Sequence, residues 1–232
     1  MLPVAQALPR GQDRKMKHAA LPATPDPSDA GKGWGRPVRL GVLASGSGSN
    51  FEALVQRCRG EQPPLAQVEL LIVNKPGCGA IERAQRLGVP WILLDHRQQP
   101  SREALDGAIV AALTNAAIEL VVMAGWMRIV TSVLIQAYPG RLINIHPSLL
   151  PSFRGADAIG QALAAGATES GCTVHEVVEA VDAGPILAQA PVPILANDDH
   201  ASLAARIQRQ EHRILPEVVL ARAQQLRPRD QG

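Results

Sequence analysis

The sequence predicts an α/β fold with a doubly wound, mostly parallel, Rossmann-like sheet, followed by an antiparallel hairpin and a helix. From residue 38 to about residue 145, short apolar runs of strand length alternate with stretches of helical periodicity. Loops rich in Gly, Ser and Pro separate these runs. After about residue 170, two apolar segments flank a turn. Strands that alternate with helices form right-handed βαβ units, so the first part implies a parallel sheet and the second an added hairpin.

The individual elements follow in order along the chain. A strand over 38–43 leads through a Ser/Gly loop into a helix over 51–57, where Phe51, Leu54 and Val55 have helical spacing. Ser101 is a candidate N-cap for a later helix. The remaining strands are expected at 68–73, 91–94, 120–124, 142–145, 173–178 and 186–194, and the remaining helices at 80–87, 101–115, 131–137 and 201–225.

The chain is expected to form one domain, residues 38–232, behind a disordered leader, residues 1–37. The leader is rich in Pro, Gly and charged residues, so it offers too little apolar surface to offset the entropy of ordering. Met16 is an alternative start within it. The leader lacks the long apolar stretch of a signal peptide.

Composition excludes several classes of protein. The net charge of +2 and the aromatic content of 3% favour neither a nucleic acid nor a membrane as partner. The three cysteines are odd in number and lack CxxC spacing, so a cytoplasmic protein without a disulfide framework is expected. No group of His, Cys and carboxylate residues has metal-ligand spacing, and we therefore expect no metal.

A loop rich in Gly and Ser, residues 45–50, lies between the first strand and the first helix. Glycine lets the backbone approach a ligand closely, and the N–H groups of the helix start attract an oxyanion. The loop lacks the Gly-Lys-Ser/Thr end of a Walker A motif, and Phe51 stands where a dinucleotide fingerprint needs a small residue. The pattern favours a single phosphate, with a ligand-free turn as the alternative.

Two polar residues, Asn144 and His146, end the apolar strand predicted at 142–145. Alternation places them on one face, at the carboxyl edge where α/β sheets bind ligands. An amide can donate to a developing oxyanion, and an imidazole can move a proton. Asp182 in the predicted turn could orient that imidazole, and His175 is a supporting candidate; the alternative is that these are ordinary strand-end and turn residues. His18, His96, His200 and His212 have no partner at useful spacing.

Two longer segments carry a family resemblance. Residues 144–151, Asn-Ile-His-Pro-Ser-Leu-Leu-Pro, and residues 171–187 resemble the two signatures of the folate-dependent formyltransferase family. Residues 46–50, 124–129 and 208–212 resemble the branch of that family that acts on glycinamide ribonucleotide. The resemblance covers about residues 38–225 and implies a Rossmann-like formyltransferase fold, with a phosphate-binding half (38–140) and a folate and catalytic half (141–226).

The resemblance also implies residue roles. The catalytic trio would be Asn144, His146 and Asp182. Gly48, Ser49 and Asn50 would hold the ribonucleotide phosphate, and the same substrate would be bound with the help of Gln208, Arg209, Gln210 and Glu211. The 10-formyltetrahydrofolate co-substrate would be bound by Arg102, Met127, Arg128, Ile129, Val130, Asn144, Val178, Glu179, Ala180, Val181 and Asp182.

The implied reaction belongs to purine (IMP) synthesis. The amine of glycinamide ribonucleotide attacks the formyl carbon directly and a tetrahedral intermediate forms, whose oxyanion Asn144 and His146 stabilise. The partners implied are these two small molecules, and the chain would be a monomer or a homodimer.

The sequence departs from the family at residues 153–159, Phe-Arg-Gly-Ala-Asp-Ala-Ile, which are reminiscent of methionyl-tRNA formyltransferase. That enzyme would carry a basic C-terminal domain, whereas this chain ends at Gly232, and a formyltetrahydrofolate hydrolase would carry a domain ahead of the catalytic one. A non-catalytic nucleotide-binding module is the alternative from another class.

Overall fold

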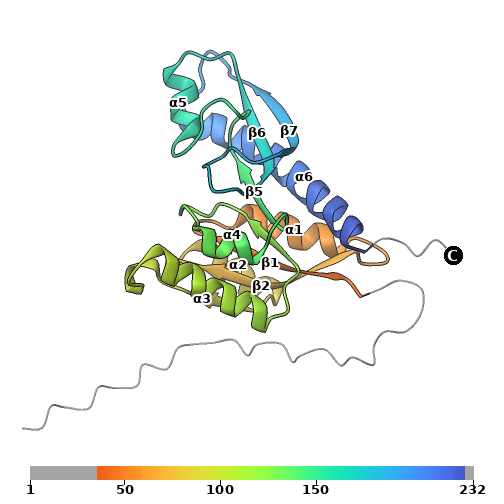
Figure 1. Cartoon of the computed structure of the whole chain (residues 1–232). Helices are drawn as coiled ribbons and strands as arrows, with labels where there is room; N and C mark the ends of the chain where they lie inside the picture. Colours follow the sequence, from red (N-terminus) through yellow and green to blue (C-terminus); the bar gives the residue numbers. More distant parts are fainter. Residues whose placement is uncertain (1–35, 228–232) are drawn as a thin grey trace, which may run out of the picture.

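A single seven-stranded sheet, in the order β3-β2-β1-β4-β5-β6-β7, forms the centre of the protein (Figure 1). The computed structural model describes residues 36–227. The predicted leader therefore lies almost entirely outside the described residues, and so does the alternative start at Met16. The predicted fold class is confirmed. Five strands run parallel to one another, β6 pairs antiparallel with the last of these, β5, and β7 pairs antiparallel with β6.

The parallel part alternates strands and helices as predicted. Its strands are β1 (Val38–Ala44), β2 (Ala66–Val73), β3 (Trp91–Leu93), β4 (Leu120–Met123) and β5 (Leu142–His146). Its helices are α1 (Ser49–Arg59), α2 (Gly79–Leu87), α3 (Arg102–Asn115) and α4 (Ser132–Ala137). Ser101 caps α3 as predicted, because its side chain accepts a hydrogen bond from the N–H of Ala104.

Helices cover both faces of this sheet. Phe51 and Leu54 of α1 belong to one buried cluster, together with side chains of α2 and of the last helix, α6 (His200–Leu226). Leu105 and Ile109 of α3 and Leu134 of α4 belong to a second cluster, on the other face. Because each strand is buried on both sides, the sequence has continuous apolar runs at β1, β2 and β4 rather than alternation.

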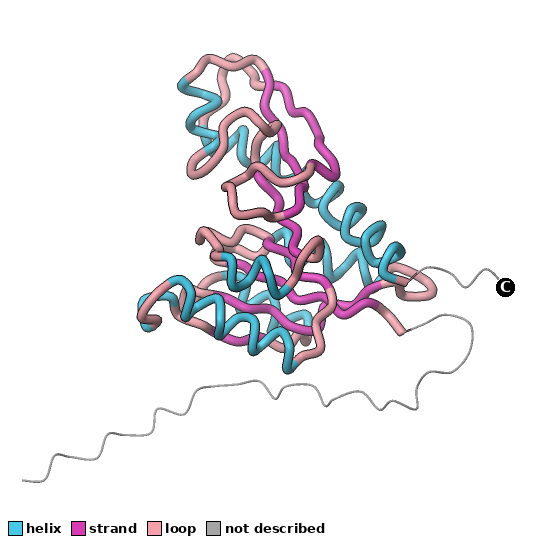
Figure 2. The backbone as a smooth tube through the Cα atoms, in the orientation of Figure 1, coloured by secondary structure: helices cyan, strands magenta, loops and turns pink. Residues whose placement is uncertain are grey.

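The C-terminal part extends beyond the parallel strands. Strands β6 (Glu169–Glu176) and β7 (Ile186–Pro193) continue the sheet from β5, and the short helix α5 (Ala158–Ala164) lies near their far end (Figure 1). Helix α6 packs against both strands and then returns along α1 (Figure 2). Residues far apart in sequence, in α1 and α6, are thereby brought together.

The structure differs from the prediction in four local features. Helix α5 and the 3-10 turn at His96–Gln98 were not expected, because both are too short to show a helical period. Strand β6 begins at Glu169 rather than at 173, since its first residues are polar or Gly. Residues 177–185 link β6 to β7 as a longer loop rather than a tight turn.

The strand order indicates where in the sheet a ligand site is expected. From β1 the chain moves to β2 and β3, and then returns to the other side of β1 through β4. The loops that follow β1 and β4 diverge at this switch point, and a crevice is expected outside the carboxyl ends of the strands. The Gly/Ser loop follows β1, and the segment after β4 begins at Ala124.

Candidate active site

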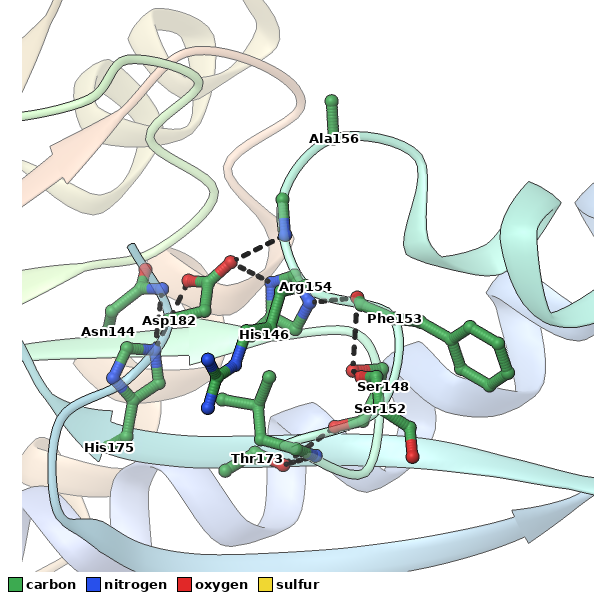
Figure 3. Close-up of polar contacts among 12 residues, drawn as sticks. Asn144, His146, Ser148, Ser152, Phe153, Arg154, Ala156, Thr173, His175 and Asp182 are labelled. Carbon is green, nitrogen blue, oxygen red and sulfur yellow. Dashed lines mark hydrogen bonds and ion pairs between the residues drawn. The ribbon is translucent and has the colours of Figure 1, made fainter. Parts of the chain in front are cut away.

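The sheet register brings two of the predicted side chains together. Strand β5 pairs antiparallel with β6, so that Asn144 lies opposite His175, and His146 lies opposite Thr173. Directly opposed residues point to the same face of a sheet. His175, which the sequence left as a supporting candidate, therefore lies beside Asn144 (Figure 3).

The hydrogen bonds of His175 indicate which of its two ring nitrogens carries the hydrogen. Its Nδ1 lies 2.8 Å from the carbonyl oxygen of Glu176, which can only accept, so Nδ1 carries the hydrogen. Nε2 is then free to accept a hydrogen bond from the Asn144 amide nitrogen, 3.1 Å away. The amide of Asn144 is thus oriented, and its second N–H and its oxygen remain for other partners.

His146 lies between two oxygen acceptors. Its Nε2 lies 2.8 Å from the carbonyl oxygen of Phe153, and its Nδ1 lies 3.4 Å from Oδ2 of Asp182 (Figure 3). The ring is only 6% exposed. Because the Phe153 carbonyl fixes a hydrogen on Nε2, the proton that can move is on Nδ1, on the side of the carboxylate.

Asp182 contacts residues from three different segments. It has a left-handed backbone (φ 50°), and its Oδ2 accepts a hydrogen bond of 2.8 Å from the N–H of Gly155. Its Oδ1 lies 3.6 Å from Nε2 of His175. Burial alone would raise the pKa of Asp182, but His175 and His146 in their charged forms, together with the Gly155 N–H, outweigh burial and hold that pKa below its ordinary value. The carboxylate is therefore ionised at neutral pH.

These side chains open onto a cavity of about 520 Å³. Asn144, His146, His175 and Asp182 all line it, next to the segment after β4 and the loop between β6 and β7. Its walls are largely apolar, and Met127 and Ile129 are 71% and 54% exposed within it. Small-molecule sites typically combine such volume and apolar walls with a few convergent polar groups.

Most of the residues predicted to contact folate line this cavity. They are Met127, Arg128, Ile129, Val130, Val178, Glu179 and Val181, besides the catalytic candidates. Arg102 and Ala180 do not line it: Arg102 is the exposed first residue of α3, and Ala180 is exposed in the loop.

The predicted phosphate loop is held by α6. Nε2 of Gln208 donates to Oγ of Ser49 at 2.7 Å, and Nδ2 of Asn50 donates to Oε2 of Glu211 at 2.7 Å. Gly48 precedes α1 with φ 77°, and a Cβ there would lie 2.6 Å from Cα of Ala80, so glycine is required. Oδ1 of Asn50 is buried and has no hydrogen-bond partner among the described residues.

The other two residues predicted from α6 lie elsewhere. Arg209 is exposed, and Oε1 of Gln210 accepts a hydrogen bond from Arg213. Residues three apart share a helix face, so Gln208 and Glu211 reach the loop while the two residues between them do not. Burial raises the pKa of Glu211, and the hydrogen bond from Asn50 opposes that rise.

Several site residues were missed from the sequence. His200, which had no partner at useful spacing, lines the cavity and lies 3.1 Å from Asp157, which caps α5. Gly155 supplies the N–H bound to Asp182. Asp106 holds the end of the segment after β4 through Thr131. No local sequence signal indicates such contacts, because each joins residues far apart in the chain.

Within residues 36–227, no three His, Cys, Asp or Glu side chains gather in a way that could hold a metal ion. In the same part of the chain, no helix is long and apolar enough to cross a membrane.

The fold and the site together define a class: α/β proteins that bind small molecules at the carboxyl edge of a parallel sheet, here with an amide, an imidazole and a carboxylate facing the cavity. Residues 38–219 match the family model described as formyl transferase. The chain belongs to this formyl transferase family, and the family membership indicated by its motifs is confirmed.

The similar proteins carry more specific names. The chain is 42% identical over 181 residues to a phosphoribosylglycinamide formyltransferase of Bacillus subtilis, covering 78% of this chain and 92% of that protein. A glycinamide ribonucleotide transformylase 1 structure from Symbiobacterium toebii has a TM-score of 0.79 at 43% identity, covering 82% of this chain and 89% of that one.

Other relatives are much longer. A trifunctional purine biosynthetic protein adenosine-3 of Drosophila pseudoobscura pseudoobscura is 47% identical over 179 residues, which are 77% of this chain and 13% of that protein. The human protein of the same name is 42% identical over 179 residues, 18% of its length. The chain thus spans less than a fifth of these relatives.

Proposed function

We propose that this chain transfers the formyl group of 10-formyltetrahydrofolate to the amine of 5-phosphoribosylglycinamide, a step of purine (IMP) synthesis. The observation that carries the proposal is the meeting of Asn144, His146 and Asp182 at a cavity whose wall is hydrogen-bonded to Ser45 of the Gly/Ser loop. The names of the similar proteins support the same activity.

The cavity suits a folate-sized co-substrate. Its volume of about 520 Å³ and its largely apolar walls match a flat aromatic ligand, and Asn144, His146 and Asp182 are among the polar side chains that line it. The formyl group would lie beside these three side chains. The co-substrate supplies the formyl carbon as an electrophile, and the chain supplies the groups that bind, orient and move protons.

Asn144 is assigned the role of oxyanion donor. As the substrate amine attacks the formyl carbon, the formyl oxygen gains negative charge in a tetrahedral intermediate. One N–H of Asn144 is used by His175, and the other is free to donate to this oxygen. A donor that is already oriented stabilises the transition state without reorganisation.

His146 and Asp182 are assigned the proton transfers. With Nε2–H held by Phe153, His146 presents Nδ1 toward the carboxylate and the cavity. A protonated Nδ1 stabilises the oxyanion as a second donor. Asp182, ionised at neutral pH, orients the ring and accepts the proton that the attacking amine releases on its way to the leaving nitrogen.

The ribonucleotide phosphate is assigned to the loop of Gly48, Ser49 and Asn50. The first turn of α1 has N–H groups without helical partners, and Gln208 holds Ser49 in place. Ser45, the first residue of the Gly/Ser loop, bonds to Gly125 and Met127, which line the cavity. The two sites are therefore adjacent, as a direct transfer requires.

The division into halves at residues 140 and 141, the cytoplasmic location, and the monomer or homodimer stay predictions, as do the leader and the roles of Arg102, Arg209, Gln210 and Ala180.

The test is a spectrophotometric assay of the purified chain with 10-formyl-dideazafolate and glycinamide ribonucleotide. We expect turnover that requires both substrates. The variant His146→Ala should keep the fold and bind both substrates but lose turnover. The matched control is His96→Ala, which removes a histidine outside the cavity and should keep turnover.

Each outcome is informative. Deformylation by water alone, or transfer to another amine, would contradict the proposed acceptor and place the chain elsewhere in the family. Near-normal turnover by His146→Ala would contradict the mechanism while leaving the substrates in place. Binding of glycinamide ribonucleotide without any transfer would favour a non-catalytic nucleotide-binding module.

A further inference from the structure

One wall of the cavity is an irregular segment, residues 125–130, which follows β4. All six of its residues line the cavity, and the large apolar side chains of Met127 and Ile129 are exposed there. A segment without regular structure takes its position from contacts with the rest of the molecule. The contacts at its two ends therefore determine the shape of this wall.

The first end is bonded to Ser45, which is 2% exposed. The N–H of Ser45 donates to the carbonyl oxygen of Gly125 at 3.0 Å, and the Oγ of Ser45 accepts from the N–H of Met127 at 2.9 Å. These two bonds hold the start of the wall against the end of β1.

The second end is bonded to Asp106 of α3. Its Oδ2 accepts from the N–H of Thr131 at 2.5 Å and from the Oγ1 of Thr131 at 2.9 Å. The same hydroxyl accepts from the N–H of Val133 and so caps α4. Thr131, the residue that follows the wall, is thus held by α3 and at the same time caps α4.

The burial of Asp106 needs an explanation. It is 2% exposed and lies on α3 between Leu105 and Ile109 of the apolar cluster. A buried carboxylate is costly unless it is well hydrogen-bonded, and an apolar residue would pack here without that cost. Both bonds of its Oδ2 go to Thr131, so holding this end of the wall is what the carboxylate does in the structure.

We propose that Asp106 is a positioning residue for the folate side of the cavity, and that it acts by holding the 125–130 wall through Thr131. This inference rests on the proposed function. Without the carboxylate, the far end of the wall loses two bonds while Ser45 still holds the near end. The wall then samples positions that fit the co-substrate poorly, whereas the phosphate loop keeps its own contacts with α6.

The experiment measures binding by calorimetry, on the full chain, with 10-formyl-dideazafolate and glycinamide ribonucleotide as separate probes. For Asp106→Ala we expect the dissociation constant of the folate probe to rise about tenfold to hundredfold, which corresponds to the usual contribution of one hydrogen bond to a charged acceptor, because only part of the lost bonding is felt at the ligand. The constant for the ribonucleotide should change less than about twofold, because the hydrogen bonds of Ser49 and Asn50 to α6 are untouched.

Two further variants separate positioning from general destabilisation. Asp106→Asn should restore most of the folate affinity, since an amide oxygen in the place of Oδ2 can accept from both the N–H and the hydroxyl of Thr131. Leu113→Val shortens a fully buried side chain of the same helix, two turns from Asp106. It should lower the melting temperature and leave the folate affinity unchanged.

Equal folate affinity of Asp106→Ala and the unaltered chain would overturn this inference alone. An equal loss of folate affinity in Leu113→Val would overturn it as well, because the effect would then be general. If the unaltered chain binds no folate probe, the proposed function and this inference both fail. Should Asp106→Ala not fold, Thr131→Ala removes the hydroxyl bond to Asp106 together with the cap of α4, and unchanged folate affinity there would overturn the inference.

Discussion

The amide nitrogen of Asn144 lies 3.1 Å from Nε2 of His175, across the antiparallel pair formed by β5 and β6. The carbonyl oxygen of Glu176 holds the hydrogen of His175 on Nδ1, so Nε2 is the acceptor. The neighbouring strand thereby orients the amide before any substrate binds. A side chain that is already oriented is what oxyanion stabilisation requires.

Replacing Asn144 tests this role directly. We expect Asn144→Ala to lower kcat about 10²-fold to 10³-fold, the usual effect of removing one oxyanion donor, with little change in either KM. His175→Ala leaves the amide present but unrestrained and should lower kcat about tenfold, the equivalent of about one hydrogen bond. Steady-state kinetics with both substrates gives these values. A larger loss for His175→Ala than for Asn144→Ala would mean that the imidazole itself contacts the reacting atoms.

Asp182 should determine the rate without determining the acid limb of the pH profile. Burial would raise its pKa, but His175, the Gly155 N–H and His146 hold that pKa below the ordinary 3.8. A depressed carboxyl pKa means that the stability it contributes is present above the unfolded pKa and is lost only as the pH falls through the lower folded value. Above about pH 5 this group does not titrate, so a decline of kcat between about pH 5 and pH 7 belongs to another group.

The variant Asp182→Asn keeps the backbone, because Asn also tolerates the left-handed conformation seen at φ 50°. We expect kcat to fall about 10²-fold to 10⁴-fold across the whole pH range, since the proton acceptor is removed. The measurement is kcat as a function of pH for both proteins. An Asn variant that matches the unaltered chain at any pH above 5 would contradict the assigned role.

The fold could be predicted from the sequence because its cause is local. Continuous apolar runs define β1 to β5, helical spacing defines the helices between them, and Asn144 and His146 stand out as polar residues that end β5. Helix α5 was missed because only seven residues, mainly Ala and Gly, form it. Its start depends on the side chain of Asp157, which has no apolar period beside it.

The site was less predictable, since its contacts join distant residues. The N–H that holds Asp182 belongs to Gly155, and the carbonyl that holds His146 belongs to Phe153; both lie in the segment that departs from the family. Family resemblance pointed to Asp182, but no spacing rule could show what holds it. The same limit applies to α6, where the resemblance included Arg209 and Gln210 but helix geometry turns only Gln208 and Glu211 toward the loop.

Gly48 should be the least replaceable residue of the phosphate loop. Alanine there needs a left-handed backbone and places its Cβ 2.6 Å from Cα of Ala80. We expect Gly48→Ala to lower the free energy of unfolding by about 1–3 kcal/mol and to raise the KM for the ribonucleotide more than the KM for folate. The matched control is Gly46→Ala, whose added Cβ would meet nothing within 4 Å and should leave the stability unchanged. Equal stability of the two variants would contradict the strain argument.

Glu211 should make the protein less stable as its carboxyl ionises. It is 8% exposed, and burial raises its pKa above the ordinary 4.5, although the bond from Asn50 opposes the rise. The sign follows from proton binding: the folded state holds the proton more tightly than the unfolded one, so stability falls as the pH rises from the unfolded pKa to the folded pKa. Above the folded pKa the full cost of the buried charge remains. In Glu211→Gln an amide oxygen still accepts from Asn50, and the charge is gone.

The variant Glu211→Gln should therefore be at least as stable as the unaltered chain at neutral pH, and the difference should disappear as the pH falls below about 4.5. Urea unfolding at a series of pH values measures it. The control is Glu217→Gln on the same helix, where the carboxylate is 54% exposed beside Arg213 and its removal should change the free energy of unfolding by less than about 0.5 kcal/mol. A Glu211→Gln variant that is clearly less stable at neutral pH would mean that the ionised carboxylate is a net stabilising partner of Asn50. In that case the negative charge of Glu211 would stabilise the predicted phosphate loop rather than lower the stability of the folded protein.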